Sequence, residues 1–197
     1  MEQVITNLWV GGDKDVPEAK KRGYARLSAT KDGIDSHRSM LGYTGRSAPA
    51  GPEYLFARRG DVMALNLIDV DDPEMIPWEM LEAGVKFIAE MLLSGHKILV
   101  HCNAGHSRGP TMAFMAMRAI GELPQPFNRA KHIFRTLYPP YSPGHGMECK
   151  AREHWLELEN KYANTSGKIN QRFPYTLGKA CKAGDAQRGQ HKRRCAV

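Results

Sequence analysis

The sequence predicts an α/β fold, a single domain with a central, mainly parallel sheet of four or five strands flanked by helices. Short apolar runs that suit buried strands alternate with longer segments whose apolar residues recur every three or four positions. The 197 residues suffice for one well-buried domain and are too few for two of ordinary size. Four scattered cysteines without paired spacing do not form a disulfide framework.

The first elements are a strand at residues 4–10, a short helix at 16–23 and a strand at 24–28. Residues 31–60 are then expected to be irregular, because Gly, Ser, Pro, Asp and Arg dominate them. So long a segment in a small domain is either a solvated insertion or a substrate-recognition flap, and the sequence leaves both open.

Regular structure returns with a strand at residues 62–68 and a helix at 77–94, whose apolar residues follow a helical spacing. Two more helices are expected at residues 126–137 and 147–162. A helix at residues 111–120 follows the stretch on which the functional prediction depends.

That stretch is Lys97-Ile-Leu-Val-His-Cys-Asn-Ala-Gly-His-Ser-Arg-Gly-Pro-Thr111, which is typical of a buried strand, a tight loop and the first turn of a helix. Such a unit directs backbone N–H groups and the positive end of a helix dipole toward one point, which favours an anion. Gly105 lets the backbone turn inward without a side chain. The stretch therefore predicts an anion site.

Cys102 and Arg108 bracket this loop. A cysteine beside a helix N-terminus should have its pKa lowered well below about 8.5, and its thiolate can attack at neutral pH. Arg108 can offer a planar bidentate fork to two oxygens of a tetrahedral anion. A zinc site at His101, Cys102 and His106 would need a fourth ligand, which the sequence does not supply, so no metal is expected.

The motif HCNAGHSR resembles the signature of the cysteine-dependent phosphatases, and HC-x-x-G-x-S-R is closest to the dual-specificity branch of the tyrosine phosphatase superfamily. The resemblance covers roughly residues 4–160. It implies a phosphatase-type phosphate loop, a phosphocysteine on Cys102 that water then hydrolyses, and no organic cofactor or metal. The implied substrate-binding residues follow the cysteine: Asn103, Ala104, Gly105, His106, Ser107 and Arg108.

The resemblance also implies an aspartic acid that protonates the leaving oxygen, about 31 residues before the cysteine, which matches Asp71. Asp69 is the second choice and Asp72 the third. We expect Asp72, which precedes Pro73, to be a helix-capping or solvated loop acid instead. Acids at the carboxyl end of a strand share an edge of the sheet with the cysteine loop.

The chain departs from the family at Gly109, where a Ser or Thr hydroxyl usually helps to expel the thiolate in the second step. Either Thr111 or Ser107 replaces that hydroxyl, or hydrolysis of the intermediate is slow.

The predicted function is a phosphoprotein phosphatase that hydrolyses phosphotyrosine and, if its pocket is shallow, phosphoserine and phosphothreonine. Three alternatives are an RNA 5′-triphosphatase of the same superfamily, a phosphoinositide phosphatase, whose branch has lysines in the loop where this chain has none, and a phosphate-binding module whose turnover is slow because of Gly109. The sequence leaves the physiological substrate and the oligomeric state open.

Residues 1–163 form the expected catalytic domain, with 20 basic and 20 acidic residues, and residues 164–197 form a basic, flexible tail with eight basic residues and one acid. The tail could contact nucleic acid or acidic partners, or only aid solubility. We expect no signal peptide, no membrane span and a cytoplasmic protein, since a nucleophilic thiol requires reducing surroundings.

Overall fold

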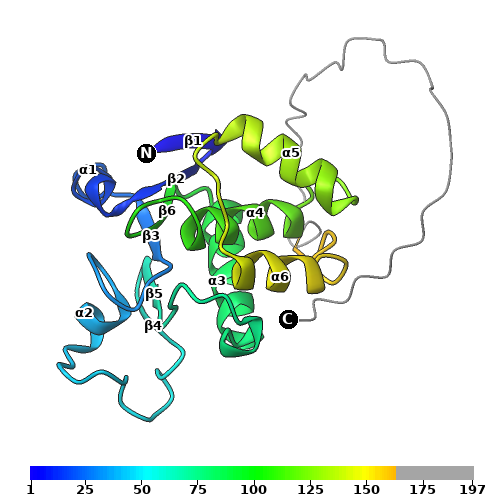
Figure 1. The fold of residues 1–197 in the computed structure, drawn as a ribbon. Helices are drawn as coiled ribbons and strands as arrows, with labels where there is room; N and C mark the ends of the chain where they lie inside the picture. Colours follow the sequence, from blue (N-terminus) through cyan, green and yellow to red (C-terminus); the bar gives the residue numbers. More distant parts are fainter. Residues whose placement is uncertain (163–197) are drawn as a thin grey trace, which may run out of the picture. The chain divides into compact units, whose positions relative to one another are not determined.

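The computed structural model describes residues 1–162, so the predicted tail lies outside the described residues. Its centre is a six-stranded sheet in the order β1-β2-β6-β3-β5-β4 (Figure 1). The strands are β1 (Glu2–Ile5), β2 (Leu8–Gly12), β3 (Ala25–Ser28), β4 (Phe56–Arg59), β5 (Val62–Leu65) and β6 (Ile98–Cys102). The four inner strands run parallel and the two edge strands antiparallel, which confirms the mainly parallel fold.

Both edge strands differ from the prediction and raise the strand count above the expected four or five. The single strand expected at residues 4–10 is a hairpin of β1 and β2, because the chain reverses at Asn7, whose φ of 65° is left-handed. Strand β4 lies inside the segment expected to be irregular, where pairing with β5 stabilises it. The same segment holds a short helix, α2 (His37–Leu41), which Ser36 caps.

The remaining helices lie close to their predicted ranges. They are α1 (Val16–Lys21), α3 (Trp78–Leu93), α4 (Arg108–Ala119), α5 (Phe127–Leu137) and α6 (His145–Glu153), with 3₁₀ turns η1 (Asp13–Asp15) and η2 (Pro73–Met75). The helix expected at residues 147–162 is wrong in its extent, because α6 ends at Glu153 and turns follow. Among the helices of residues 1–162, none combines the length and apolar character needed to cross a membrane.

Strand β6 is buried on both faces, as its apolar run predicts. Ile98, Val100 and Cys102 belong to the main core, to which α3 and α4 contribute. Leu99 points to the opposite face and packs with Val16 of α1 and its neighbours. The loop that follows β6 therefore starts from a strand held between two helical layers.

The four parallel strands all end at the same edge of the sheet, where ligands of open α/β sheets bind. The segments that leave this edge are residues 13–15 after β2, 29–34 after β3, 66–72 after β5 and 103–107 after β6. These four segments form the candidate site.

Candidate active site

In the loop between β6 and α4, the carbonyl groups of four residues accept hydrogen bonds from other parts of the protein. The hydrogen bonds are Asp13 N–H to Asn103 O (3.1 Å), Tyr138 O–H to Gly105 O (2.8 Å), Ser142 N–H to His106 O (2.9 Å) and Thr111 N–H to Ser107 O (2.9 Å). Within residues 1–162, no hydrogen bond engages the backbone N–H groups of residues 103–107. The loop thus has the backbone arrangement that an anion site requires.

Two glycines allow this loop to pack tightly. Gly105 has a φ of 79°, and a Cβ there would lie 2.8 Å from the carbonyl carbon of Gly11 at the end of β2. A Cβ at Gly109 would lie 2.7 Å from the carbonyl carbon of His101 and 2.9 Å from the nitrogen of Cys102. The first turn of α4 therefore packs directly against the backbone of β6, and a side chain at position 109 would clash with it.

Cys102 is the last residue of β6 and only 2% exposed. His101, just before it, is fully buried, and its Nδ1 lies 3.2 Å from Asp13 Oδ1. The hydrogen bond with His101 holds the pKa of Asp13 below its usual range, although partial burial acts in the opposite direction. The strand end that carries the cysteine is thus tied to η1 through an ionised carboxylate.

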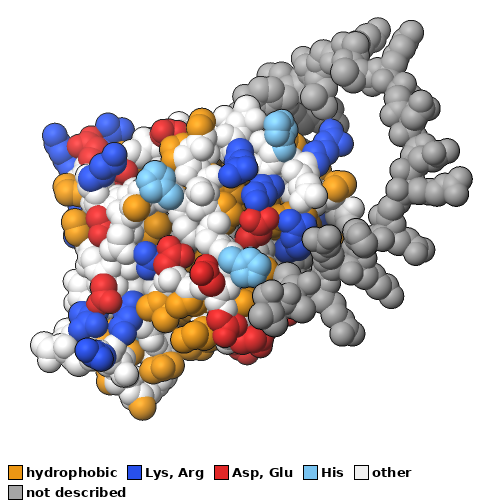
Figure 2. Space-filling model, viewed as in Figure 1, with side chains coloured by type: hydrophobic (Ala, Val, Ile, Leu, Met, Phe, Trp, Pro, Cys, Tyr) orange, Lys and Arg blue, Asp and Glu red, His pale blue; other side chains and the backbone are white. Residues whose placement is uncertain are grey.

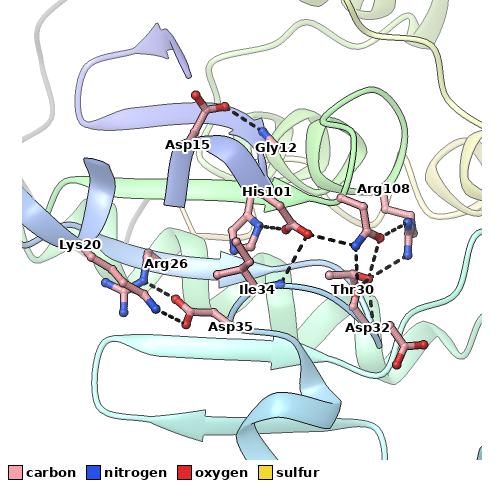
Figure 3. A network of polar contacts seen from close by, with 12 residues as sticks. Gly12, Asp15, Lys20, Arg26, Thr30, Asp32, Ile34, Asp35, His101 and Arg108 are labelled. Carbon is pink, nitrogen blue, oxygen red and sulfur yellow. Dashed lines mark hydrogen bonds and ion pairs between the residues drawn. The ribbon is translucent and has the colours of Figure 1, made fainter. Parts of the chain in front are cut away.

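Arg108 opens α4 and turns inward across the loop, with a side chain only 12% exposed (Figure 3). Its Nη1 donates to Thr30 Oγ1 at 3.2 Å and to Leu67 O at 3.1 Å, and its Nη2 donates to Asn103 Oδ1 at 2.8 Å. The structure thus places Cys102 and Arg108 at the two ends of one short loop, with the guanidinium over it.

The Asn103 side chain links the loop to two neighbouring segments. Its Nδ2 donates to Asp13 Oδ2 at 3.1 Å and to Asp32 O at 2.6 Å, while its Oδ1 accepts from Thr30 Oγ1 at 3.0 Å. Gly33 packs so closely that a Cβ there would lie 2.5 Å from Asn103 Nδ2. The start of segment 31–60 therefore closes over one side of the loop.

Sequence reasoning missed Asp13 and Thr30 as site residues. Each follows a parallel strand at the edge where the cysteine loop lies, and this position was the available signal. Asn103 was predicted only as a substrate-binding residue, without the side-chain contacts that the structure shows.

The three candidate acids have different surroundings. Asp69 Oδ1 accepts from Ser107 Oγ at 3.2 Å, and its Oδ2 lies 3.5 Å from Arg108 Nε. Asp72 Oδ1 accepts from Glu74 N–H at 2.9 Å and caps η2, the first of the two roles expected for it. Asp71 has an exposed side chain, and its carbonyl lies beside Gly146 of α6.

Histidines stand near the loop on the side of α6. His106 is exposed, with Nδ1 3.2 Å from Pro140 O, and His145 opens α6 with its Nε2 3.5 Å from Cys149 Sγ. Within residues 1–162, no group of three His, Cys, Asp or Glu side chains is arranged to hold a metal ion.

Acidic and histidine side chains lie together in the middle of the face drawn in Figure 2. Hydrophobic side chains gather below them, over the segment that joins β5 to α3. This segment contains Ile68 and Met75, which are 37% and 57% exposed.

No family model matches the chain, but comparison with known proteins gives relatives that are named as phosphatases. The mouse "Dual specificity protein phosphatase 22" is 25% identical over 153 residues, which cover 78% of this chain and 72% of the relative. "Putative tyrosine phosphatase 123R" of Invertebrate iridescent virus 6 is 30% identical over 98 residues, covering 48% of this chain and 68% of the relative. The crystal structure of DUSP15 matches with a TM-score of 0.55 at 18% identity, over 79% of this chain and 86% of that one, a likeness of fold.

Proposed function

Because the chain belongs to the dual-specificity branch of the tyrosine phosphatase superfamily, we propose that it hydrolyses phosphotyrosine, and also phosphoserine and phosphothreonine, in proteins through a phosphocysteine. The observation that carries this proposal is the loop itself. Its carbonyls bond outward, its N–H groups are left for an anion, and Arg108 turns in toward the end at which Cys102 lies.

In the first step, Cys102 Sγ attacks phosphorus as the thiolate, so that an S–P bond forms while the P–O ester bond breaks. The N–H groups from Asn103 to Arg108 and the guanidinium bind the non-bridging oxygens, whose charge they stabilise. Asp71 gives a proton to the leaving oxygen. In the second step, water gives a proton to Asp71 and attacks phosphorus, and the S–P bond breaks to release phosphate and the thiolate.

The surroundings of the aspartates support Asp71 as the acid. Asp69 already accepts a hydrogen bond from Ser107 and is ion-paired with Arg108, which suits a carboxylate that positions the loop. Asp72 is used as a cap. All three aspartates are exposed at this edge of the sheet, but within residues 1–162 the carboxylate of Asp71 makes no hydrogen bond or ion pair, so it can meet a leaving group.

The alternative functions are not favoured, because the relatives are named as dual-specificity protein phosphatase and tyrosine phosphatase. Neither an RNA 5′-triphosphatase nor a non-catalytic phosphate-binding module is needed to explain the site. A nucleophilic thiol requires reducing surroundings, and we therefore place the activity in the cytoplasm.

The test compares hydrolysis of a phosphotyrosine peptide, a phosphothreonine peptide and a 5′-triphosphorylated RNA. We expect both peptides to be hydrolysed, the activity to be lost in Cys102→Ser, and acid quenching to trap phosphate on the wild-type protein. Cys149→Ser, which removes another thiol of the described residues, should remain active. Activity that survives in Cys102→Ser, or hydrolysis of the RNA alone, would contradict the proposal.

A further inference from the structure

Three of the N–H groups of the Arg108 guanidinium donate hydrogen bonds to the protein, and two on one edge do not. A guanidinium has five N–H groups. Two on Nη1 point to Thr30 and Leu67, and one on Nη2 points to Asn103. The two that remain are on Nε and Nη2, which together form the side-on fork that matches two oxygens of a phosphate.

The Nε atom of this edge is buried, whereas the Nη2 hydrogen bond to Asn103 is exposed. Within the described residues, Nε is buried and has no hydrogen-bond acceptor. The nearest charged group is Asp69, whose Oδ2 lies 3.5 Å away as an ion pair. A buried donor without an acceptor is costly, so its retention indicates an oxyanion that accepts from it.

The Asn103 side chain is the contact that fixes which edge is committed. Its Oδ1 accepts from Arg108 Nη2 and lies 3.0 Å from Thr30 Oγ1, which shares its single hydrogen between this oxygen and Asp32 O at 2.7 Å. Thr30 Oγ1 itself accepts from Arg108 Nη1. The three side chains thus meet at the Nη end of the guanidinium, and Figure 3 shows the contact between Arg108 and Thr30. Without the amide oxygen, Nη2 would lose its acceptor and the guanidinium could rotate.

Asp13 in turn fixes the orientation of the Asn103 amide. One carboxylate oxygen accepts from Asn103 Nδ2, so that Oδ1 is left to face Arg108. The other oxygen meets His101 Nδ1, at the residue before the cysteine. Asp13 therefore links the strand that carries Cys102 to the Asn103 amide that binds Arg108.

We propose that Asn103, held by Asp13, is a positioning residue that aims the Nε and Nη2 edge of Arg108 at the phosphate. The inference deepens the proposed function and rests on it for its catalytic meaning, but its physical content is oxyanion binding. This role is separate from the backbone N–H of Asn103, which any residue supplies.

The experiment measures the binding of inorganic phosphate to the full chain by calorimetry, together with KM and kcat for an aryl phosphate. We expect Asn103→Ala to weaken phosphate binding about tenfold, since it removes a hydrogen bond to a charged group. KM should rise with phosphate dissociation, and Asp13→Asn should give a smaller change of the same kind. Asn128→Ala is the matched control, because Asn128 also accepts from an arginine, Arg152, and should change phosphate binding less than twofold.

A double-mutant cycle that combines Asn103→Ala with Arg108→Ala shows whether Asn103 acts by positioning Arg108 or by supporting the loop structure in general. If Asn103 acts through Arg108, Asn103→Ala should add less than a twofold loss of tungstate or phosphate binding in the Arg108→Ala background. The alkylation rate of Cys102 by iodoacetamide should stay within twofold of wild type in Asn103→Ala, because the loop remains folded. An undiminished tenfold loss in the Arg108→Ala background, or wild-type phosphate binding in Asn103→Ala, would overturn the inference. Phosphate binding with the predicted pattern but no turnover would overturn the proposed function alone.

Discussion

The two sides of the phosphate loop are built differently. On one side, Asp13, Thr30 and Asp32 bind the side chain of Asn103, and Asp13 also holds His101; we call this the anchored side. On the other, residues 69–72 meet the loop through Asp69, and Asp71 remains exposed; we call this the open side. For the proposed function, the difference teaches that the groups which bind the phosphate are fixed by contacts, whereas the acid that meets varied leaving groups is left accessible.

The largest expected effect is on the open side. Asp71→Asn should lower kcat/KM for a phosphate ester with a poor leaving group by about 10²–10⁴, because it removes the proposed proton donor. The same change should have little effect on phosphate binding. The measurement is steady-state hydrolysis across pH, with an activated aryl phosphate as the insensitive substrate.

Asp69→Asn is the comparison for this prediction. It should lower kcat/KM less than tenfold and should leave the pH dependence of the proton donor in place, because Asp69 contacts Ser107 and Arg108 as a positioning group. If Asp69→Asn shows the larger loss and Asp71→Asn shows none, the acid is Asp69.

The second prediction concerns the missing hydroxyl at Gly109. Thr111 Oγ1 donates to Ser107 O at 2.8 Å, and Ser107 Oγ donates to Asp69, so neither candidate hydroxyl is free to help the thiolate leave. One positioned donor is worth about 10²–10³ in rate. Rapid mixing with an aryl phosphate should therefore show a burst of leaving group near one equivalent, followed by slow turnover. Linear release from the first turnover would show that the first step is limiting.

The third prediction concerns Gly109→Ser, which places the family's hydroxyl at position 109. We expect that this hydroxyl does not speed up hydrolysis of the phosphocysteine. A side chain at position 109 would meet the backbone of His101 and Cys102 at less than 3 Å. Gly109→Ser should therefore destabilise the fold by about 1–3 kcal/mol and distort the anchored loop. Gly45→Ala is the control, since the nearest atom to its Cβ is Ser47 O at 3.9 Å. Urea unfolding and burst kinetics measure both effects, and a stable Gly109→Ser with faster turnover would contradict this account.

The open and anchored sides also differ in how far the sequence predicts them. Cys102, Arg108 and the loop between them are local in sequence, so a strand, a loop and a helix start suffice to predict them. Asp13 lies 88 residues from His101, and Thr30 lies 78 residues from Arg108. Their contacts depend on the strand order β2-β6-β3, which no local pattern specifies.

The short elements of segment 31–60 were missed for another reason. Strand β4 and helix α2 have four and five residues, too few for a periodic pattern to stand out among turn-forming residues. Tertiary contacts stabilise them instead: β4 pairs with β5, and His37 of α2 is buried with its Nε2 2.7 Å from Glu53 O.

The smallest expected effect is a pH dependence of stability that comes from His37. It tests whether the segment that binds Asn103 on the anchored side needs a neutral His37. Burial lowers the pKa of His37 from its ordinary value of 6.5, so the unfolded chain binds the proton more tightly than the folded chain does. The stability that neutral His37 contributes is fully present above pH 6.5 and is lost as pH falls through the lowered pKa.

Wild-type protein should accordingly unfold at a lower temperature at pH 5 than at pH 7, and His37→Gln should show a smaller shift. The other histidines are the same in both proteins, so the difference between the two shifts isolates His37. Because α2 belongs to the segment whose first residues bind Asn103, hydrogen exchange at pH 5 should rise in residues 31–46 before it rises in the core strand β6. Equal shifts in the two proteins would show that support for the anchored side does not depend on a neutral His37.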